Sequence, residues 1–165
     1  MGIKKRTLQK GEDMSKKVID LLNQARSREL TAITQYMAQH YELEDQDFGK
    51  LASKMKEIAI QEMKHAEKLA ERILFLNGEP TSKPDAGVRK GQEIAEMLKT
   101  DMGLETQAIQ MYNAASLVCA AEKDQISKGL FEELLKEEEE HLNTFENIKD
   151  HVAKLGASYL STLTG

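Results

Sequence analysis

The tetrapeptides EMKH at residues 62–65 and EEEH at residues 138–141 share the pattern Glu-x-x-His. Residues three positions apart lie on one face of a helix, so each segment directs a carboxylate and an imidazole at the same point. A single motif of this kind in a glutamate-rich chain is more often a solvated surface pair. Here residues 62 and 138, and residues 65 and 141, are each 76 positions apart, which indicates a repeated unit.

The same offset recurs on the N-terminal side of each motif. Glu29 and Glu105 are 76 positions apart, and so are Tyr36 and Tyr112. Each half therefore reads Glu-x₆-Tyr on one helix and Glu-x-x-His on the next, 33 residues after the first glutamate. The repeat predicts two helical hairpins related by a pseudo-two-fold axis, where four carboxylates and two imidazoles converge. The six candidate ligands are Glu29, Glu62, His65, Glu105, Glu138 and His141.

Apolar residues at helical spacing predict an all-α fold. A Gly-containing acidic stretch follows the first helix, both prolines lie between the second and third helices, and Gly156 precedes the apolar tail ASYLSTL, where we expect a short fifth helix. The four long helices are expected at about 18–41, 50–77, 92–121 and 125–154.

The connection between the second and third helices predicts the topology. A second helix of about 28 residues would be about 42 Å long, and the connection from Gly78 to Lys90 can span about 43 Å when extended. It can therefore run the length of the bundle and place the second and third helices parallel. This is the ferritin-like four-helix bundle with one long crossover.

Length and composition limit the classes of function. A chain of 165 residues, 40 % apolar and 31 % charged, fits a single domain over residues 1–165. Its net charge of -5 argues against nucleic-acid binding through phosphate neutralisation and suits cationic substrates. We expect no membrane association, because the chain has no apolar run of 18 residues.

The single cysteine bears on the compartment. Cys119 is the only cysteine in the sequence, so an intrachain disulfide and a site with four cysteine ligands are impossible. We therefore expect a reducing, cytoplasmic location. The N-terminal segment MGIKKRTLQKGEDMSKK is basic but lacks the apolar core of a secretory signal, which favours the same compartment.

A bound metal would explain why so many carboxylates can be buried together. Burying several carboxylates side by side without a counter-charge would force some of them to protonate. Glutamate and histidine without thiolate favour iron or manganese, although zinc can occupy the same groups. We expect Glu62 and Glu138 to bridge two ions, with Glu29 and His65 on one ion and Glu105 and His141 on the other.

Two tyrosines follow the first glutamate of each half by seven residues, or two helical turns. Tyr36 and Tyr112 could therefore hydrogen-bond the ligand carboxylates. An equally good interpretation is that both fill the core and tether a hydroxyl group there.

Several of these segments resemble bacterioferritins, and the resemblance covers nearly the whole chain. The segments are REL-AI-QY around Glu29, EIAIQEMKHAEKLAERI, GLETQAIQMY, EEEEHL-T-ENI and LGASYL, and they are most similar to bacterioferritins of sulfate-reducing bacteria. The resemblance implies iron storage, with a di-iron ferroxidase centre at the six candidate ligands. It also implies a homo-oligomer of 24 subunits built from two-fold dimers, Fe(II) and O₂ or H₂O₂ as reactants, and a ferredoxin-type electron donor.

The same resemblance implies a role for Met63. In bacterioferritins the methionine of the E-M-x-H segment, one from each subunit of a dimer, is an axial ligand of haem. Met63 follows Glu62 by one position and so lies about 100° away from the metal cluster around the helix, where an interface with a second subunit is expected. A methionine on a helix is otherwise usually a packing residue.

Other polar residues depart from the family pattern or match no ligand position. Some bacterioferritins carry a His and an Asp before the Glu-x-x-His motif that hold an additional iron. This chain has Glu57 and Gln61 there, so the resemblance does not decide whether it has this accessory site. We expect Cys119 to be a buried small side chain. Helix-end positions are expected for His40 and His151, and solvated or cage-lining positions for Glu137, Glu139 and Glu140.

Three other functions remain open from the sequence. A rubrerythrin-like di-iron peroxidase would use the same bundle, but rubrerythrins usually add a module with paired Cys-x-x-Cys motifs, and this chain has one cysteine. A cage that binds haem or iron without turnover would load iron but would not oxidise Fe(II) at a significant rate. A purely structural bundle would turn the six candidate ligands towards solvent.

Overall fold

The computed structural model describes residues 2–165, with side chains from residue 16 onward, and all regular elements in this part are helical. The all-α bundle with a short fifth helix that the sequence predicts is confirmed. The long helices are α1 (Gly2–Asp45), α2 (Gly49–Phe75), α3 (Ile94–Ala121) and α4 (Gln125–Leu155). They are followed by α5 (Ala157–Leu160) and a 3₁₀ turn, η1 (Ser161–Leu163).

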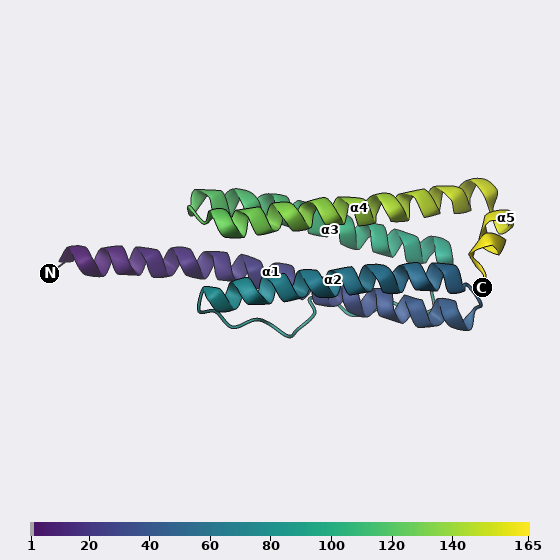
Figure 1. Ribbon diagram of the computed structural model, residues 1–165, viewed down its shortest axis with the longest axis horizontal. Helices are drawn as coiled ribbons and strands as arrows, with labels where there is room; N and C mark the ends of the chain where they lie inside the picture. The colour runs from purple at the N-terminus through teal and green to yellow at the C-terminus, as the bar shows by residue number, and fades with distance from the viewer. Residues whose placement is uncertain (1) are drawn as a thin grey trace.

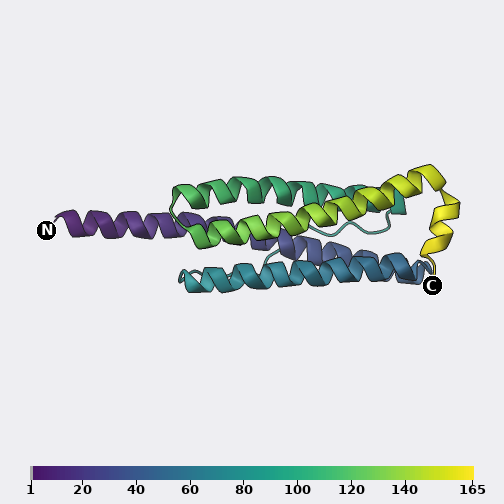
Figure 2. The same ribbon diagram turned by 45° about the horizontal axis from the view of Figure 1, so that its top comes forward.

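The helices form two antiparallel hairpins, α1 with α2 and α3 with α4 (Figures 1 and 2). Residues 76–93 cross from the end of α2 to the start of α3 at the other end of the bundle, so α2 and α3 run parallel (Figure 1). The long crossover predicted from its length is therefore confirmed. It places the two Glu-x-x-His helices, α2 and α4, antiparallel to each other, as a pseudo-two-fold axis requires.

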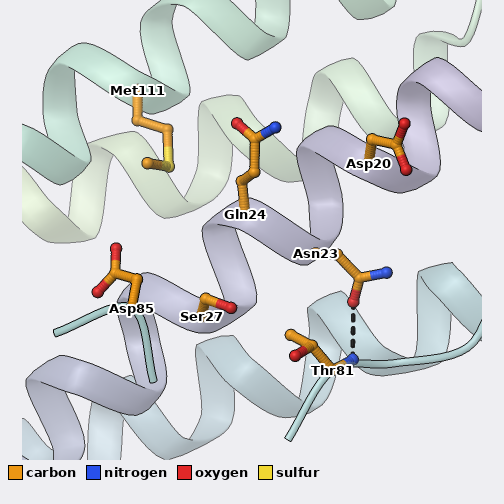
Figure 3. A pocket seen from close by; sticks show the side chains of 7 residues that line it. All are labelled: Asp20, Asn23, Gln24, Ser27, Thr81, Asp85 and Met111. Carbon is orange, nitrogen blue, oxygen red and sulfur yellow. Dashed lines mark hydrogen bonds between the residues drawn. The ribbon is translucent and has the colours of Figure 1, made fainter. Parts of the chain in front are cut away.

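A row of polar side chains on α1 holds the crossover in place. Asn23 Oδ1 accepts a hydrogen bond of 2.8 Å from the backbone N–H of Thr81 (Figure 3), and Thr31 Oγ1 accepts one of 3.0 Å from the backbone N–H of Asp85. Gln35 pairs with the crossover backbone further along. These residues are spaced by multiples of four, so they share one face of α1. The crossover backbone is thus satisfied by side chains rather than by regular structure.

The first helix begins much earlier than the sequence indicates. The apolar period starts at Val18, whereas α1 starts at Gly2 and extends past the ends of the neighbouring helices (Figure 1). Periodicity detects a helix through the face that it buries, and the basic segment before Val18 has no apolar stripe. The predicted start of this helix was therefore wrong, and its end lies four residues beyond the expected one, while the ends of α2, α3 and α4 agree within two residues.

The bundle interior consists of two apolar clusters with buried polar residues between them. The clusters use residues on either side of the Glu-x-x-His motif in α2, such as Ile58 in one and Leu69 in the other. Close packing on both sides fixes the rotamers of the polar layer. The larger buried side chains are Tyr36, Leu51, Met55 and Phe145 in the first cluster and Leu22, Ile73, Tyr112 and Phe131 in the second.

Candidate metal centre

All six candidate ligands lie in this polar layer and are at most 5 % exposed. They form two groups of four residues that share Glu62 and Glu138. One group adds Glu29 and His65, and the other adds Glu105 and His141. The structure therefore brings together every residue of the predicted set, one glutamate from each helix and one histidine from each of α2 and α4.

The two shared glutamates each face both imidazole rings. Glu62 Oε2 lies 2.9 Å from His65 Nδ1, and Glu62 Oε1 lies 3.0 Å from His141 Nδ1. Glu138 Oε1 and Oε2 lie 3.1 Å from the same two nitrogens, respectively. A carboxylate that offers one oxygen to each of two neighbouring positions has the geometry of a bridging ligand.

The remaining glutamates each face one imidazole. Glu29 Oε1 is 3.7 Å from His65 Nδ1, and Glu105 Oε1 is 3.9 Å from His141 Nδ1. The two rings stack with their centroids 5.8 Å apart. Each Nδ1 atom and its carboxylates thus outline one position for an ion, and the two positions are related by the 76-residue repeat.

The donor set fits metal ions better than protons. Each Nδ1 atom faces three carboxylates, and a single N–H group cannot donate to all of them. Both oxygens of Glu62 are close to imidazole nitrogens, yet at angles that leave them without a hydrogen-bond partner among the described residues. A cation at each position would satisfy these lone pairs, and glutamate with histidine suits iron, manganese or zinc.

The pKa values of the cluster show that its buried carboxylates repel one another. Burial and the charges of Glu29 and Glu105 raise the pKa of Glu62 to about 8. Burial and neighbouring carboxylates likewise raise the pKa of Glu138 to about 7. Burial alone would lower the pKa of His141, but its hydrogen bond to Glu138 helps to raise it to about 11. The cluster therefore retains protons at neutral pH that a metal ion would displace.

The two tyrosines that are separated by the 76-residue offset both contact the cluster, each from the opposite hairpin. The Tyr36 hydroxyl donates to Glu105 Oε1, and the Tyr112 hydroxyl donates to Glu29 Oε1. Each tyrosine is fully buried, and burial with the adjacent negative charges raises the pKa of Tyr36 well above its ordinary value. Each hydroxyl thus orients the carboxylate that belongs to the other half of the repeat, in addition to its ring filling the core.

Two residues outside the predicted ligand set also contact the cluster. Glu137 was expected on a solvated or cage-lining face, and its side chain is 36 % exposed, but its Oε2 atom also lies 2.8 Å from His65 Nε2. Gln61 Oε1 lies 2.7 Å from His141 Nε2. The contacts run between hairpins, which helical spacing within one helix cannot indicate. Residues 61 and 137 are themselves 76 positions apart, and this signal could have identified them.

The other candidate residues lie away from the six ligands. Met63 is 55 % exposed on α2. Cys119 is buried, as predicted. His40 lies near the end of α1, where it is buried and its Nδ1 atom lies 2.9 Å from the carbonyl oxygen of Ala52. Exposed positions are occupied by Glu57, Glu139, Glu140 and His151.

A groove of about 450 Å³ opens beside α1 and the crossover, with Met111 of α3 on its other side (Figure 3). Its lining includes Asp20 and Asp85 but none of the six candidate ligands. The candidate metal centre lies in the bundle interior, where its six ligands are almost fully buried, and it is separate from this groove. None of the helices in the described part of the chain combines the length and apolar character needed to cross a bilayer.

Comparison with known proteins gives consistent results at the levels of family, sequence and structure. The family model for the ferritin-like domain matches residues 19–155. The bacterioferritin of Desulfovibrio desulfuricans is 46 % identical over 154 residues, covering 93 % of this chain and 86 % of that protein. The bacterioferritin of Brucella melitensis is 40 % identical, covering 85 % of this chain and 87 % of that protein.

A solved structure gives the same result in three dimensions. An X-ray structure of Desulfovibrio desulfuricans bacterioferritin, described with its diiron site in different catalytic states, superposes with a TM-score of 0.92. The two chains are 45 % identical, and the match covers 94 % of this chain and 91 % of that chain. Both the helical framework and the sequence it carries are therefore similar.

Proposed function

The chain belongs to the bacterioferritin family of ferritin-like proteins, and we propose that it stores iron and oxidises Fe(II) to Fe(III) at its buried metal centre. The observation that supports this most strongly is the pair of glutamates, Glu62 and Glu138, that each face both imidazoles. This arrangement suits two ions about 3.5 to 4 Å apart. The proposal assigns the six candidate ligands to a ferroxidase site.

In this mechanism Fe(II) is the substrate and the chain supplies the geometry. His65 and His141 offer Nδ1 atoms to the two positions, while Glu29 and Glu105 complete one position each. Two Fe(II) ions give up one electron each, and O₂ or H₂O₂ takes up the electron pair. Tyr36 donates to one terminal carboxylate, so that this carboxylate keeps its orientation when the charge of the ions changes.

A pair of histidine substitutions tests the proposal. His65→Ala and His141→Ala each remove the only nitrogen ligand of one position, so we expect the initial rate of Fe(II) oxidation to fall at least about 10-fold in each. His151→Ala is the matched control, because His151 is exposed and outside the cluster. Stopped-flow absorbance with O₂ and separately with H₂O₂ measures the rate and the preferred oxidant. An unchanged rate in both cluster variants would remove the assigned site.

Haem binding forms a second part of the proposal and involves Met63. Its side chain is exposed in the isolated chain, where a second subunit could bring an equivalent methionine to the other face of a haem. We expect Met63→Leu to abolish the haem absorption band of the purified protein without slowing Fe(II) oxidation. Met111→Leu, away from this surface, serves as control. Full haem content in Met63→Leu would contradict this assignment.

We also propose that the chain assembles into a cage, built from two-fold dimers, that stores the mineral. Several large apolar side chains are more than half exposed in the isolated chain, as expected for subunit interfaces. A cage of 24 chains of 18.6 kDa would have a mass of about 450 kDa by light scattering. A cytoplasmic location and a ferredoxin-type donor for iron release stay predictions. The exposed apolar residues are Leu74, Phe75, Leu117 and Ile126.

A further inference from the structure

Gln61 and Glu137 occupy equivalent positions in the two halves, immediately before the glutamate of each Glu-x-x-His motif. Each contacts the outer ring nitrogen of the histidine from the opposite hairpin. Gln61 Oε1 is 2.7 Å from His141 Nε2, and Glu137 Oε2 is 2.8 Å from His65 Nε2. The repeat therefore conserves the contact but not its charge, because one partner is a neutral amide and the other is a carboxylate.

The role of these contacts follows from the orientation of the rings. The Nδ1 atoms of His65 and His141 face the carboxylates of the metal centre, so Nδ1 is the ligand atom and Nε2 carries the proton. Gln61 and Glu137 then both accept a hydrogen bond from an Nε2–H group. Such a partner fixes the ring and increases the electron density at the ligand nitrogen. A carboxylate does this more strongly than an amide, because the hydrogen bond is charge-assisted.

The surroundings of Glu137 are also specific to one half. Its Oε1 atom lies 3.7 Å from Lys68 Nζ, and Lys68 is held in turn by Glu133 at 2.8 Å. The position equivalent to Lys68 is Thr144, which bonds the carbonyl oxygen of its own helix. A lysine thus helps to hold the Glu137 carboxylate against His65, and no cation takes this place at residue 144.

We propose that Glu137 makes the two metal positions unequal, so that the Glu29–His65 position binds a divalent metal ion more tightly and fills before the Glu105–His141 position. Glu137 is a positioning residue in this account, since it acts through His65. Complete loss of such a partner typically weakens metal binding about 10- to 100-fold, and because the weaker position keeps an amide partner, we expect a difference at the lower end, about 10-fold. The inference rests on the proposed function, because it takes the two histidines to be ligands of separate ions.

Co(II) is a suitable probe, because it fills nitrogen and oxygen sites without oxidation by the protein and reports its coordination by visible absorption. We titrate the assembled protein with Co(II) under anaerobic conditions, with a competing chelator to resolve the tighter step. The wild type should bind two Co(II) per chain, with affinities about 10-fold apart. Glu137→Gln should weaken the tight step until the two are equal. Gln61→Glu should instead strengthen the weak step.

Controls separate this effect from a general change of charge or fold. Glu132→Gln removes the same charge from α4 at a residue that pairs with Lys128 and contacts neither Lys68 nor His65, so both affinities should stay within about 2-fold of the wild type. The double variant Gln61→Glu with Glu137→Gln should restore two unequal steps in the reverse order. His65→Ala identifies the order: its single remaining step should be weak in the wild-type background and tight when Gln61→Glu is added. Light scattering confirms that each variant assembles.

The outcomes distinguish this inference from the proposed site. If His65→Ala and His141→Ala each remove one Co(II), but the wild type shows two equal steps or Glu137→Gln changes neither, the inequality is wrong and the site stands. If neither histidine variant changes Co(II) binding, the proposed site itself is wrong.

Discussion

Asp101 is a buried acid on α3, one helical turn before Glu105, and its partner is the side-chain amide of Gln39. Gln39 Nε2 donates to Asp101 Oδ1 at 2.7 Å, while Asp101 Oδ2 and Gln39 Oε1 have no hydrogen-bond partner among the described residues. A proton on Oδ2 would let the two groups form a doubly hydrogen-bonded acid–amide pair. Burial raises the pKa of Asp101 well above its ordinary value, which favours this neutral form.

The substitution Asp101→Asn tests the neutral form. Asparagine keeps the acceptor for Gln39 and supplies a donor without a titrating proton. The raised pKa of folded Asp101 means that unfolding releases a proton above about pH 4, so wild-type stability falls as pH rises while the variant lacks this loss. We expect Asp101→Asn to gain stability over the wild type between pH 5 and pH 8, by at most about 1.4 kcal/mol per pH unit.

Urea unfolding of both proteins at pH 5 and pH 8 measures the gap, and Asp150→Asn on the exposed face of α4 is the control. A gap that stays constant between the two pH values would show that folded Asp101 is ionised.

At the residue scale, the sequence identified the groups that form the centre but not those that surround it. The repeated Glu-x-x-His motif carries its own spacing signal, since both residues lie on one helix face. Glu137 and Gln61 act across hairpins, and the pairing of Asp101 with Gln39 depends on the alignment of α3 against α1. Such contacts are set by packing between helices, which no periodicity within one helix encodes. Whether the six residues bind iron stays a prediction.

At the scale of elements, the crossover depends on α1 rather than on its own structure. Thr31 Oγ1 accepts hydrogen bonds from the backbone N–H groups of Asp85 at 3.0 Å and Ala86 at 3.2 Å. Thr31→Val keeps the shape of the side chain and removes these bonds, so that the Ala86 N–H loses its acceptor and the Asp85 N–H keeps only a longer bond of 3.3 Å to the carbonyl oxygen of Ser27. We expect the crossover to open more easily by about 1 to 3 kcal/mol.

Hydrogen exchange of the amides in residues 79–92 measures this local opening. Thr34→Val is the matched control, because the Thr34 hydroxyl bonds only carbonyl groups of its own helix at Leu30 and Thr31. Equal exchange in Thr31→Val and Thr34→Val would mean that the crossover is held by other contacts.

The helix boundaries show what a sequence can and cannot specify at this scale. Acidic and glycine-containing breaks end α1 and α2 close to the expected positions, and Gly156 ends α4 with a φ of 53°, a conformation that favours glycine. The start of α1 carries no such signal, because the sequence before Val18 has no apolar stripe.

At the scale of the whole molecule, metal loading is coupled to protons. In the absence of metal, Glu62 and Glu138 have pKa values of about 8 and about 7, so both carry protons over part of the neutral range. Ligands must lose these protons to bind a cation, and metal affinity should therefore rise with pH between 6 and 8.

We expect Zn(II) binding at pH 6.5 to release more than one proton per chain, and binding at pH 9 to release fewer. Calorimetry in two buffers with different ionisation enthalpies measures the number released. A proton count that does not change with pH would contradict the buried, protonated state of the carboxylates.

The extent of the domain and the assembly of subunits are also properties of the whole molecule, and assembly depends on contacts between chains. The family match spans residues 19–155, while a single domain over residues 1–165 stays a prediction. The exposed side chains of Met63 and Phe75 are features of an isolated chain that an assembly would cover. Closure of a cage is set by the angles between subunits, which the pattern of one chain does not encode.

The central claim is that the two halves of the chain hold a pair of iron ions between Glu62 and Glu138. Anomalous X-ray diffraction at the iron edge, on crystals loaded with Fe(II) without oxygen, tests it most directly. The account predicts two peaks per chain, about 3.5 to 4 Å apart, each about 2.1 Å from one Nδ1 atom of His65 or His141. A single peak, or iron bound only outside these six residues, would contradict it.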